Sequence, residues 1–141
     1  VEVTRRRLLA YGDSAAVGYH PICFNRQNQG YMKQQRFSFR RKARIDREVD
    51  ALGTGTLAFA SNLLNFDPSV WPYGDMDDLM FAQEAARRGI PLISLAREAG
   101  LMVAIAQGQP DSLTRTAHLD SSRHDAEMRR LIDIRKAGSQ G

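Results

Sequence analysis

The pattern of apolar and polar positions along the chain predicts a mixture of strands and helices. Two short apolar runs, Ala15–Phe24 and Leu92–Leu95, are typical of buried strands, although Pro21 is expected to break the first run or to place it at a sheet edge. Apolar residues three or four positions apart predict helices over Asp78–Arg88 and Ser122–Lys136. A helix that leads into a buried strand through a short loop is typical of α/β folds.

Weaker patterns organise the rest of the chain. They predict a helix end over residues 2–11, a polar loop over Asn25–Gly30, an extended segment over Tyr31–Phe39, a helical or irregular segment over Arg40–Val49 and a loop over Asn65–Gly74. We expect a single domain over residues 1–136 and a polar tail over residues 137–141.

The composition is that of a globular protein. The 141 residues are 43% hydrophobic and 26% charged, unlike disordered or collagen-like chains. The longest apolar stretches fall short of the roughly 20 residues that cross a bilayer, so no transmembrane helix is expected. The single cysteine, Cys23, cannot form an internal disulfide, and no signal-peptide pattern is seen, so the cytoplasm is the expected location.

Positive charge is concentrated in the first part of the chain. Residues 1–50 carry 11 basic and 5 acidic side chains, and the densest basic run, Lys33–Arg47, contains Phe37 and Phe39 at a strand-like alternation. Such a segment could bind phosphate groups, or it could be a solvated face. It leaves open a non-enzymatic binding module that contacts nucleic acid or anionic lipid.

Three carboxylates lie within four residues at the start of the helix predicted over Asp78–Arg88. Asp75, Asp77 and Asp78 directly precede or begin its apolar positions. Acidic residues at a helix start accept free backbone N–H groups and complement the helix dipole, which is a structural role. Crowded carboxylates are also suited to general-base catalysis or to binding a divalent cation. Both interpretations stay open at this point.

A second candidate is the glycine-rich segment formed by Gly53, Thr54, Gly55 and Thr56. Its backbone N–H groups and hydroxyls could bind a phosphate or a sugar hydroxyl, or the segment could be an ordinary turn. With Ala58 it also matches a dinucleotide-binding pattern, which would suggest an NAD-linked oxidoreductase. We rank that function last, because Ile45–Leu52 carries charges where the pattern requires a buried parallel strand.

The remaining candidates are an aromatic residue and three histidines. Trp71, the only tryptophan, could stack on a sugar ring or anchor its loop. His20, His118 and His124 are too scattered to predict a metal site from spacing, and His20 is expected to be a hydrogen-bonded core residue.

Taken in order, the glycine segment, the loop to Trp71, the acidic helix start and the Gly89-Ile90-Pro91-Leu92 helix end resemble a known arrangement. Over about residues 10–106 the chain resembles the C-terminal half of bacterial family 2-like glycosyltransferases with the GT-A fold. The resemblance implies that Asp78 is the general base and that Asp77 is its neighbour.

The resemblance also implies that Gly53, Thr54, Gly55, Thr56, Trp71 and Asp75 lie near a nucleotide-sugar donor and a saccharide acceptor. It makes His118 the candidate ligand of a divalent metal, Mn²⁺ or Mg²⁺, in the complete enzyme. The family's nucleotide-binding half, with its Asp-x-Asp motif, has no counterpart in residues 1–51. The chain would then be a fragment or a degenerate relative.

The expected fold is therefore α/β, a partial GT-A-like and Rossmann-related three-layer fold that lacks the N-terminal half. The expected function belongs to the synthesis of a bacterial surface polysaccharide. A half-domain leaves a sheet edge or an apolar face open, which makes homo-oligomers a hypothesis. A transferase of this kind would be cytoplasmic, with peripheral contact at the inner face of the membrane as an open alternative.

Overall fold

The computed structural model describes residues 2–25, 30–63, 67–102 and 120–138. Its helices are α1 (Glu2–Ala10), α2 (Asp77–Arg87) and α4 (Ser122–Gly138). Its strands are β1 (Ala16–Gly18), β2 (Pro21–Cys23), β3 (Gln35–Arg36), β4 (Arg47–Val49), β5 (Ala51–Leu52) and β6 (Leu92–Ser94). Short 3-10 turns cover Gly12–Ser14, Tyr31–Lys33, Thr54–Thr56 and Pro68–Val70.

Two small three-stranded sheets form the centre of the molecule. In the first sheet, β6 lies between β1, which is parallel to it, and β4, which is antiparallel. In the second sheet, β2 lies between β3 and β5, and both neighbours are antiparallel. The prediction of a mixed α/β protein is confirmed.

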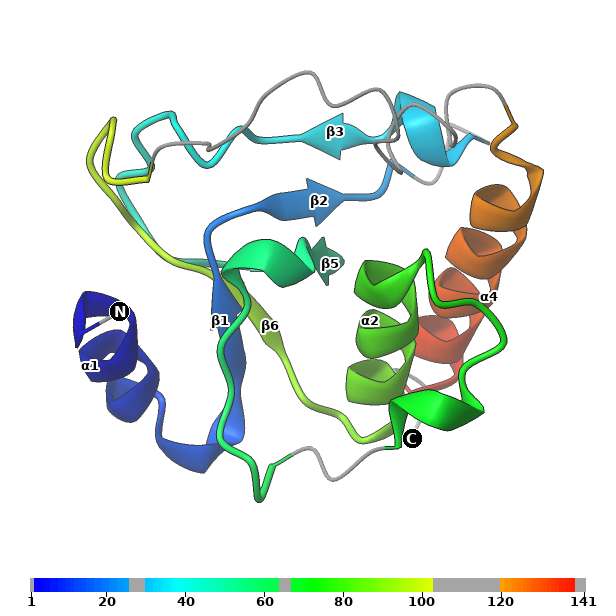
Figure 1. The fold of residues 1–141 in the computed structure, drawn as a ribbon, viewed down its shortest axis with the longest axis horizontal. Coiled ribbons are helices and arrows are strands. Elements are labelled where there is room, and N and C mark those ends of the chain that lie inside the picture. The colour runs from blue at the N-terminus through cyan, green and yellow to red at the C-terminus, as the bar shows by residue number, and fades with distance from the viewer. Residues whose placement is uncertain (1, 26–29, 64–66, 103–119, 139–141) are drawn as a thin grey trace.

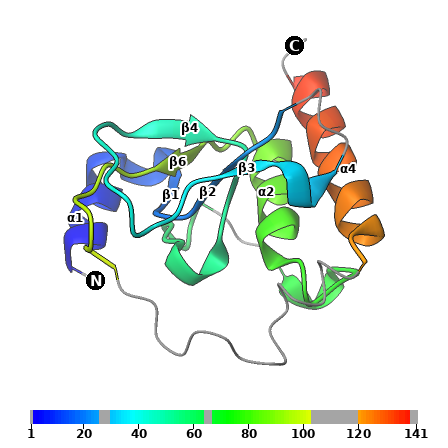
Figure 2. The same cartoon turned by 90° about the horizontal axis from the view of Figure 1, so that it is seen from above.

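Helices cover the sheets from two sides (Figure 1, Figure 2). The larger apolar cluster joins the sheets to α2 and α4, and it includes the fully buried Leu52, Leu79, Phe81 and Leu131. A smaller cluster joins β1 and β6 to partly buried apolar side chains of α1 and its surroundings. The sheets thus lie between α1 and the pair formed by α2 and α4.

Helix α2 begins and ends within one residue of its predicted bounds. Buried positions such as Leu79, Phe81 and Ala82 recur at helical spacing, which is why the pattern identified the helix. Gly89 follows the helix with a φ of +67°, a left-handed conformation that glycine adopts without strain and that ends helices. The chain then enters β6 three residues later.

Other predicted bounds need correction. The run Ala15–Phe24 is broken, as Pro21 suggested, and its two parts, β1 and β2, belong to different sheets. The segment predicted as helical or irregular ends in β4, which the pattern did not reveal because Arg47 and Glu48 are exposed and only Val49 is buried. Helix α4 continues through Gly138, so the predicted tail begins too early.

Candidate functional site

Asp78 lies in the first turn of α2, where its half-buried carboxylate meets a tyrosine from a distant part of the chain. The hydroxyl of Tyr31 donates a hydrogen bond to Asp78 Oδ2, with 2.6 Å between the two oxygens. Asp78 Oδ1 accepts the backbone N–H of Leu79 at 2.9 Å. Each carboxylate oxygen can accept a further hydrogen bond. The structure therefore fixes the carboxylate without using its full acceptor capacity.

Tyr31 is itself held between two further side chains. Its ring stacks on His124 of α4 with 5.2 Å between ring centroids, and the guanidinium carbon of Arg36 lies 4.5 Å from the Tyr31 ring centroid. Burial, together with the nearby charge of Asp78, raises the pKa of the Tyr31 hydroxyl above its ordinary range. Tyr31 therefore keeps its proton and acts as a donor. We call Tyr31, Arg36, Asp78 and His124 the Asp78 cluster.

One ring nitrogen of His124, a member of this cluster, makes no hydrogen bond to the described residues. The residue is 8% exposed, and its Nδ1 atom has no hydrogen-bond partner among the described residues. Buried polar atoms normally have partners. The imidazole that stacks on the Tyr31 ring therefore keeps hydrogen-bonding capacity among the described residues.

The glycine segment follows β5 and is joined by hydrogen bonds to Tyr19 and His20, the two residues before β2. The Gly53 N–H donates to the carbonyl of His20 at 2.8 Å, and the hydroxyl of Thr56 accepts the N–H of Tyr19 at 3.2 Å. A Cβ atom on Gly53 would lie 2.8 Å from His20 Nδ1. Gly53 is therefore required for close contact with His20.

His20 lies against the glycine segment, and its pKa responds to the charges of Arg36 and Asp78 in the Asp78 cluster. Burial is the main cause that lowers the pKa of the His20 imidazole, the charge of Arg36 lowers it further, and the charge of Asp78 raises it. His20 is half-buried and stays neutral near neutral pH. The prediction that it is a hydrogen-bonded core histidine is only partly correct, because the ring is half-buried and packs edge-on against Phe39.

Replacing Gly53 with Ala is expected to lower the free energy of unfolding by about 1–3 kcal/mol, because the new methyl group would overlap the His20 ring. The matched control is Gly55→Ala, since a Cβ there meets nothing within 4 Å. Urea unfolding of both variants provides the comparison. Equal stability of the two variants would contradict the close contact between Gly53 and His20.

The lowered pKa of His20 gives a prediction with a definite sign. Below the ordinary pKa of 6.5, the unfolded chain binds a proton at His20 that the folded chain does not bind. Stability should therefore fall as the pH is lowered from about 6.5 towards the folded pKa. Urea unfolding between pH 7 and pH 5 should show a flatter pH dependence for His20→Gln than for the wild type. Parallel profiles would contradict this assignment.

The other acidic candidates occupy different surroundings. Asp75 forms an ion pair with Arg123 of α4 at 3.0 Å, and Asp77 is exposed. The N-cap residue of α2 is Met76, whose side chain makes no capping hydrogen bond, and within the first turn Asp78 accepts the N–H of Leu79. Asp77 and Asp78 still lie in the first turn, where the helix dipole favours negative charge.

The described ranges contain no group of three His, Cys, Asp or Glu side chains that could hold a metal ion. His118, the predicted metal ligand, lies outside the described residues. Sequence reasoning did not select Tyr31, Arg36 or His124 for this site. Tyr31 and His124 are far from Asp78 along the chain, and no local motif marks them.

Trp71 lies in a different place from the Asp78 cluster. It lines a pocket of about 340 Å³ along α2, which extends from Met80 near the start of the helix to Arg87 and Arg88 at its end but includes neither Asp77 nor Asp78. The structure thus places the glycine segment against His20, whose pKa responds to the charge of Asp78, whereas Trp71 lines a pocket that does not include Asp78.

Comparisons with known proteins leave the chain without an assigned family. No protein-family model matches it, and no curated protein matches its sequence. Within the part of the chain that the structure describes, every helix is too short or too polar to cross a membrane.

Proposed function

We propose that this chain is the acceptor-side portion of a glycosyltransferase, which moves a sugar from a nucleotide-sugar donor to a hydroxyl of a saccharide acceptor. The observation that carries the proposal is the fixed carboxylate of Asp78, whose Oδ2 accepts the Tyr31 hydroxyl at 2.6 Å at the start of α2. A general base must be held in place and must keep acceptor capacity for the proton that it takes.

The order of elements supports the same proposal. A glycine-containing turn at Thr54–Thr56 comes first, then a loop, then the acidic start of α2, then Gly89 and the central strand β6. This is the order for which the chain resembles family 2-like glycosyltransferases. The GT-A fold and a role in making a surface polysaccharide belong to the proposal as well.

In the proposed reaction, the acceptor hydroxyl attacks the anomeric carbon of the donor sugar. The bond from that carbon to the diphosphate oxygen breaks, and the nucleoside diphosphate leaves with the electron pair. Asp78 takes the proton of the attacking hydroxyl. Tyr31 keeps its own proton and holds Oδ2, so it is a positioning residue.

The donor side of the reaction is assigned to a nucleotide-binding half that precedes these residues in the family. A divalent ion such as Mn²⁺ or Mg²⁺ would assist departure of the diphosphate in the complete enzyme. Residues 2–25, 30–63, 67–102 and 120–138 do not offer a three-ligand group for such an ion, so no step above passes through a metal.

Calorimetric titration of the chain with UDP and with GDP, each with and without Mn²⁺, tests whether the donor site lies outside this chain. An acceptor-side portion should bind neither nucleotide, whether or not the metal is present. Metal-dependent binding would show a complete donor site within the chain and would contradict the proposal. Circular dichroism confirms that the titrated sample is folded.

A second candidate function rests on the loop between β3 and β4. Arg40, Arg41, Lys42 and Arg44 are all exposed there, next to Ile45, which is 72% exposed. This surface would suit a binding module for nucleic acid or anionic lipid. Binding of this kind weakens steeply as salt rises, so a salt-independent affinity for a DNA oligonucleotide or for anionic vesicles would exclude it.

A further inference from the structure

The pocket beside Trp71 offers a binding site that the proposed function does not use. We propose that this Trp71 pocket binds a phosphorylated sugar ring. The residues that line it are Asp67, Val70, Trp71, Pro72, Met80, Gln83, Glu84, Arg87, Arg88 and Arg130. The ring would lie against Trp71, and the phosphate would bind to arginine. Because the pocket does not include Asp78, this inference is independent of the proposed transfer reaction.

The pocket has the size and the walls of a small-molecule site. Its volume of about 340 Å³ lies within the range of ligand pockets, which is roughly 300–1,000 Å³. The turn at Pro68–Val70 and the loop after it form one wall, and α2 and α4 form the others. Residues from three separate segments therefore converge on one concave surface.

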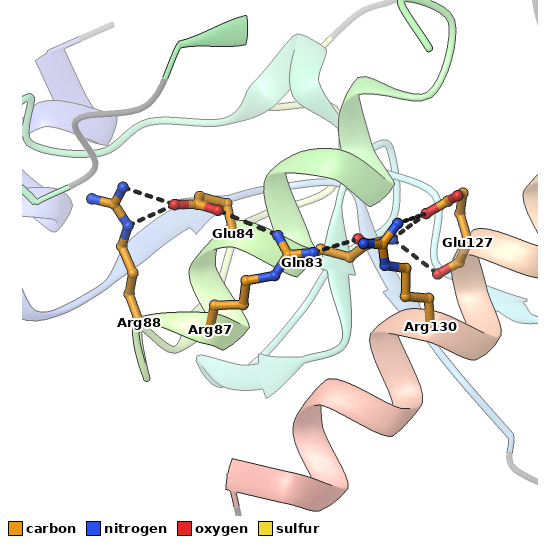
Figure 3. Close-up of polar contacts among 6 residues, drawn as sticks. All are labelled: Gln83, Glu84, Arg87, Arg88, Glu127 and Arg130. Carbon is orange, nitrogen blue, oxygen red and sulfur yellow. Dashed lines mark hydrogen bonds and ion pairs between the residues drawn. The ribbon is translucent and has the colours of Figure 1, made fainter. Parts of the chain in front are cut away.

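A buried amide organises the cationic side of the pocket (Figure 3). Gln83 is 2% exposed, and its amide group donates to Glu127 Oε2 of α4 at 2.6 Å. The carbonyl oxygen of the same amide accepts a hydrogen bond from Arg87 at 3.1 Å. Glu84 forms ion pairs with Arg87 at 3.3 Å and with Arg88 at 2.7 Å. These contacts fix the positions of Arg87 and Arg88 along one side of the pocket.

Arg130 is held more loosely than the other two arginines. Its ion pair with Glu127 is 4.0 Å long, and its side chain is 59% exposed. The guanidinium group presents several N–H donors in a planar fork that matches two oxygens of a phosphate. Arg130 can therefore turn this fork towards a phosphate in the pocket while α4 stays in place.

The remaining lining groups favour a sugar over a purely apolar ligand. Trp71 is half-buried and offers the one aromatic face among the lining residues, which suits the apolar face of a sugar ring. The carboxylates of Asp67 and Glu84 can accept hydrogen bonds from sugar hydroxyls. An apolar chain would cover these carboxylates and arginines without forming a hydrogen bond to any of them.

Two sources could present this chemistry. One is a free sugar phosphate, and the other is a lipid headgroup with a phosphorylated six-membered ring. Val70 at the pocket rim is 75% exposed, which would allow the rim to touch a membrane surface. Two probes separate the sources: glucose 1-phosphate in solution, and phosphatidylcholine vesicles with and without phosphatidylinositol.

The test uses Trp71 as its own reporter, since it is the only tryptophan in the chain. Glucose 1-phosphate, or vesicles that contain phosphatidylinositol, should change the tryptophan emission in a saturable manner, and glucose alone should not. Arg130→Gln should weaken this binding at least about tenfold, because a charged hydrogen-bonding pair is lost. The matched control is Arg129→Gln, since Arg129 is exposed on the same helix and does not line the pocket.

Each outcome has a defined meaning. Binding of either probe that depends on Arg130 supports the site, and the probe that binds identifies the source. An unchanged emission with both probes would overturn the inference. It would also be overturned if glucose bound as well as glucose 1-phosphate, or if Arg129→Gln weakened binding as much as Arg130→Gln.

Discussion

Asp78→Asn is expected to lower sugar transfer by about 10²- to 10⁴-fold, the usual contribution of a general base. The measurement is the rate of nucleoside diphosphate release by a polypeptide that joins this chain to the donor-binding half that the proposal requires. An amide cannot take the proton of the acceptor hydroxyl, but its carbonyl oxygen can still accept the hydrogen bond from Tyr31. The folded structure should therefore survive the change.

Two companion variants make this result specific. Asp77→Asn changes the charge of the exposed neighbouring residue and should reduce transfer far less. Tyr31→Phe keeps the ring beside His124 but removes the donor to Asp78, so it should lower transfer without preventing it. Near-normal turnover of Asp78→Asn, with an unchanged urea midpoint, would overturn the role of Asp78.

Leu131→Ala should be the most damaging of the stability variants, with a loss of about 3–5 kcal/mol in the free energy of unfolding. Leu131 is 0% exposed and belongs to the apolar cluster that joins α4 to α2 and the sheets. Removing its side chain leaves a cavity, because rigid elements surround the site and relax only in part. A loss of this size is a large fraction of the stability of a small domain.

Urea unfolding followed by circular dichroism measures this loss. The matched control is Leu9→Ala, which makes the same change in α1 at a residue that is 61% exposed. The control should change stability by less than about 0.5 kcal/mol. A similar small effect for Leu131→Ala would mean that α4 does not pack against the core in the way described.

The local sequence pattern predicted the helices that bury one of their own faces. Leu79 and Ala82 mark α2, and Met128 and Leu131 mark α4, because buried residues three positions apart recur in both helices. Strand β4 has only Val49 buried, so its three residues give no alternation to detect. Its position is set by pairing with β6, a contact between distant parts of the chain.

The sequence predicted only those site residues that a short motif marks. Asp78 was identified because it stands in an acidic cluster at the start of α2. Tyr31 meets Asp78, and His124 meets the Tyr31 ring, through tertiary packing, and no local motif marks either residue. The glycine segment was identified as a binding candidate, but the structure also gives Gly53 a packing role against His20.

The place of β6 in the first sheet has a consequence for how the chain folds. This strand joins β1 to β4, yet its partner residues in β1 lie far away in sequence, since Ala16 pairs with Leu92. Closing so long a segment slows folding, because the entropy of the loop is lost before the strand contacts form. During synthesis, β1 and β4 must wait for β6 to emerge from the ribosome. A nascent chain that stops before Leu92 therefore has no strand between them.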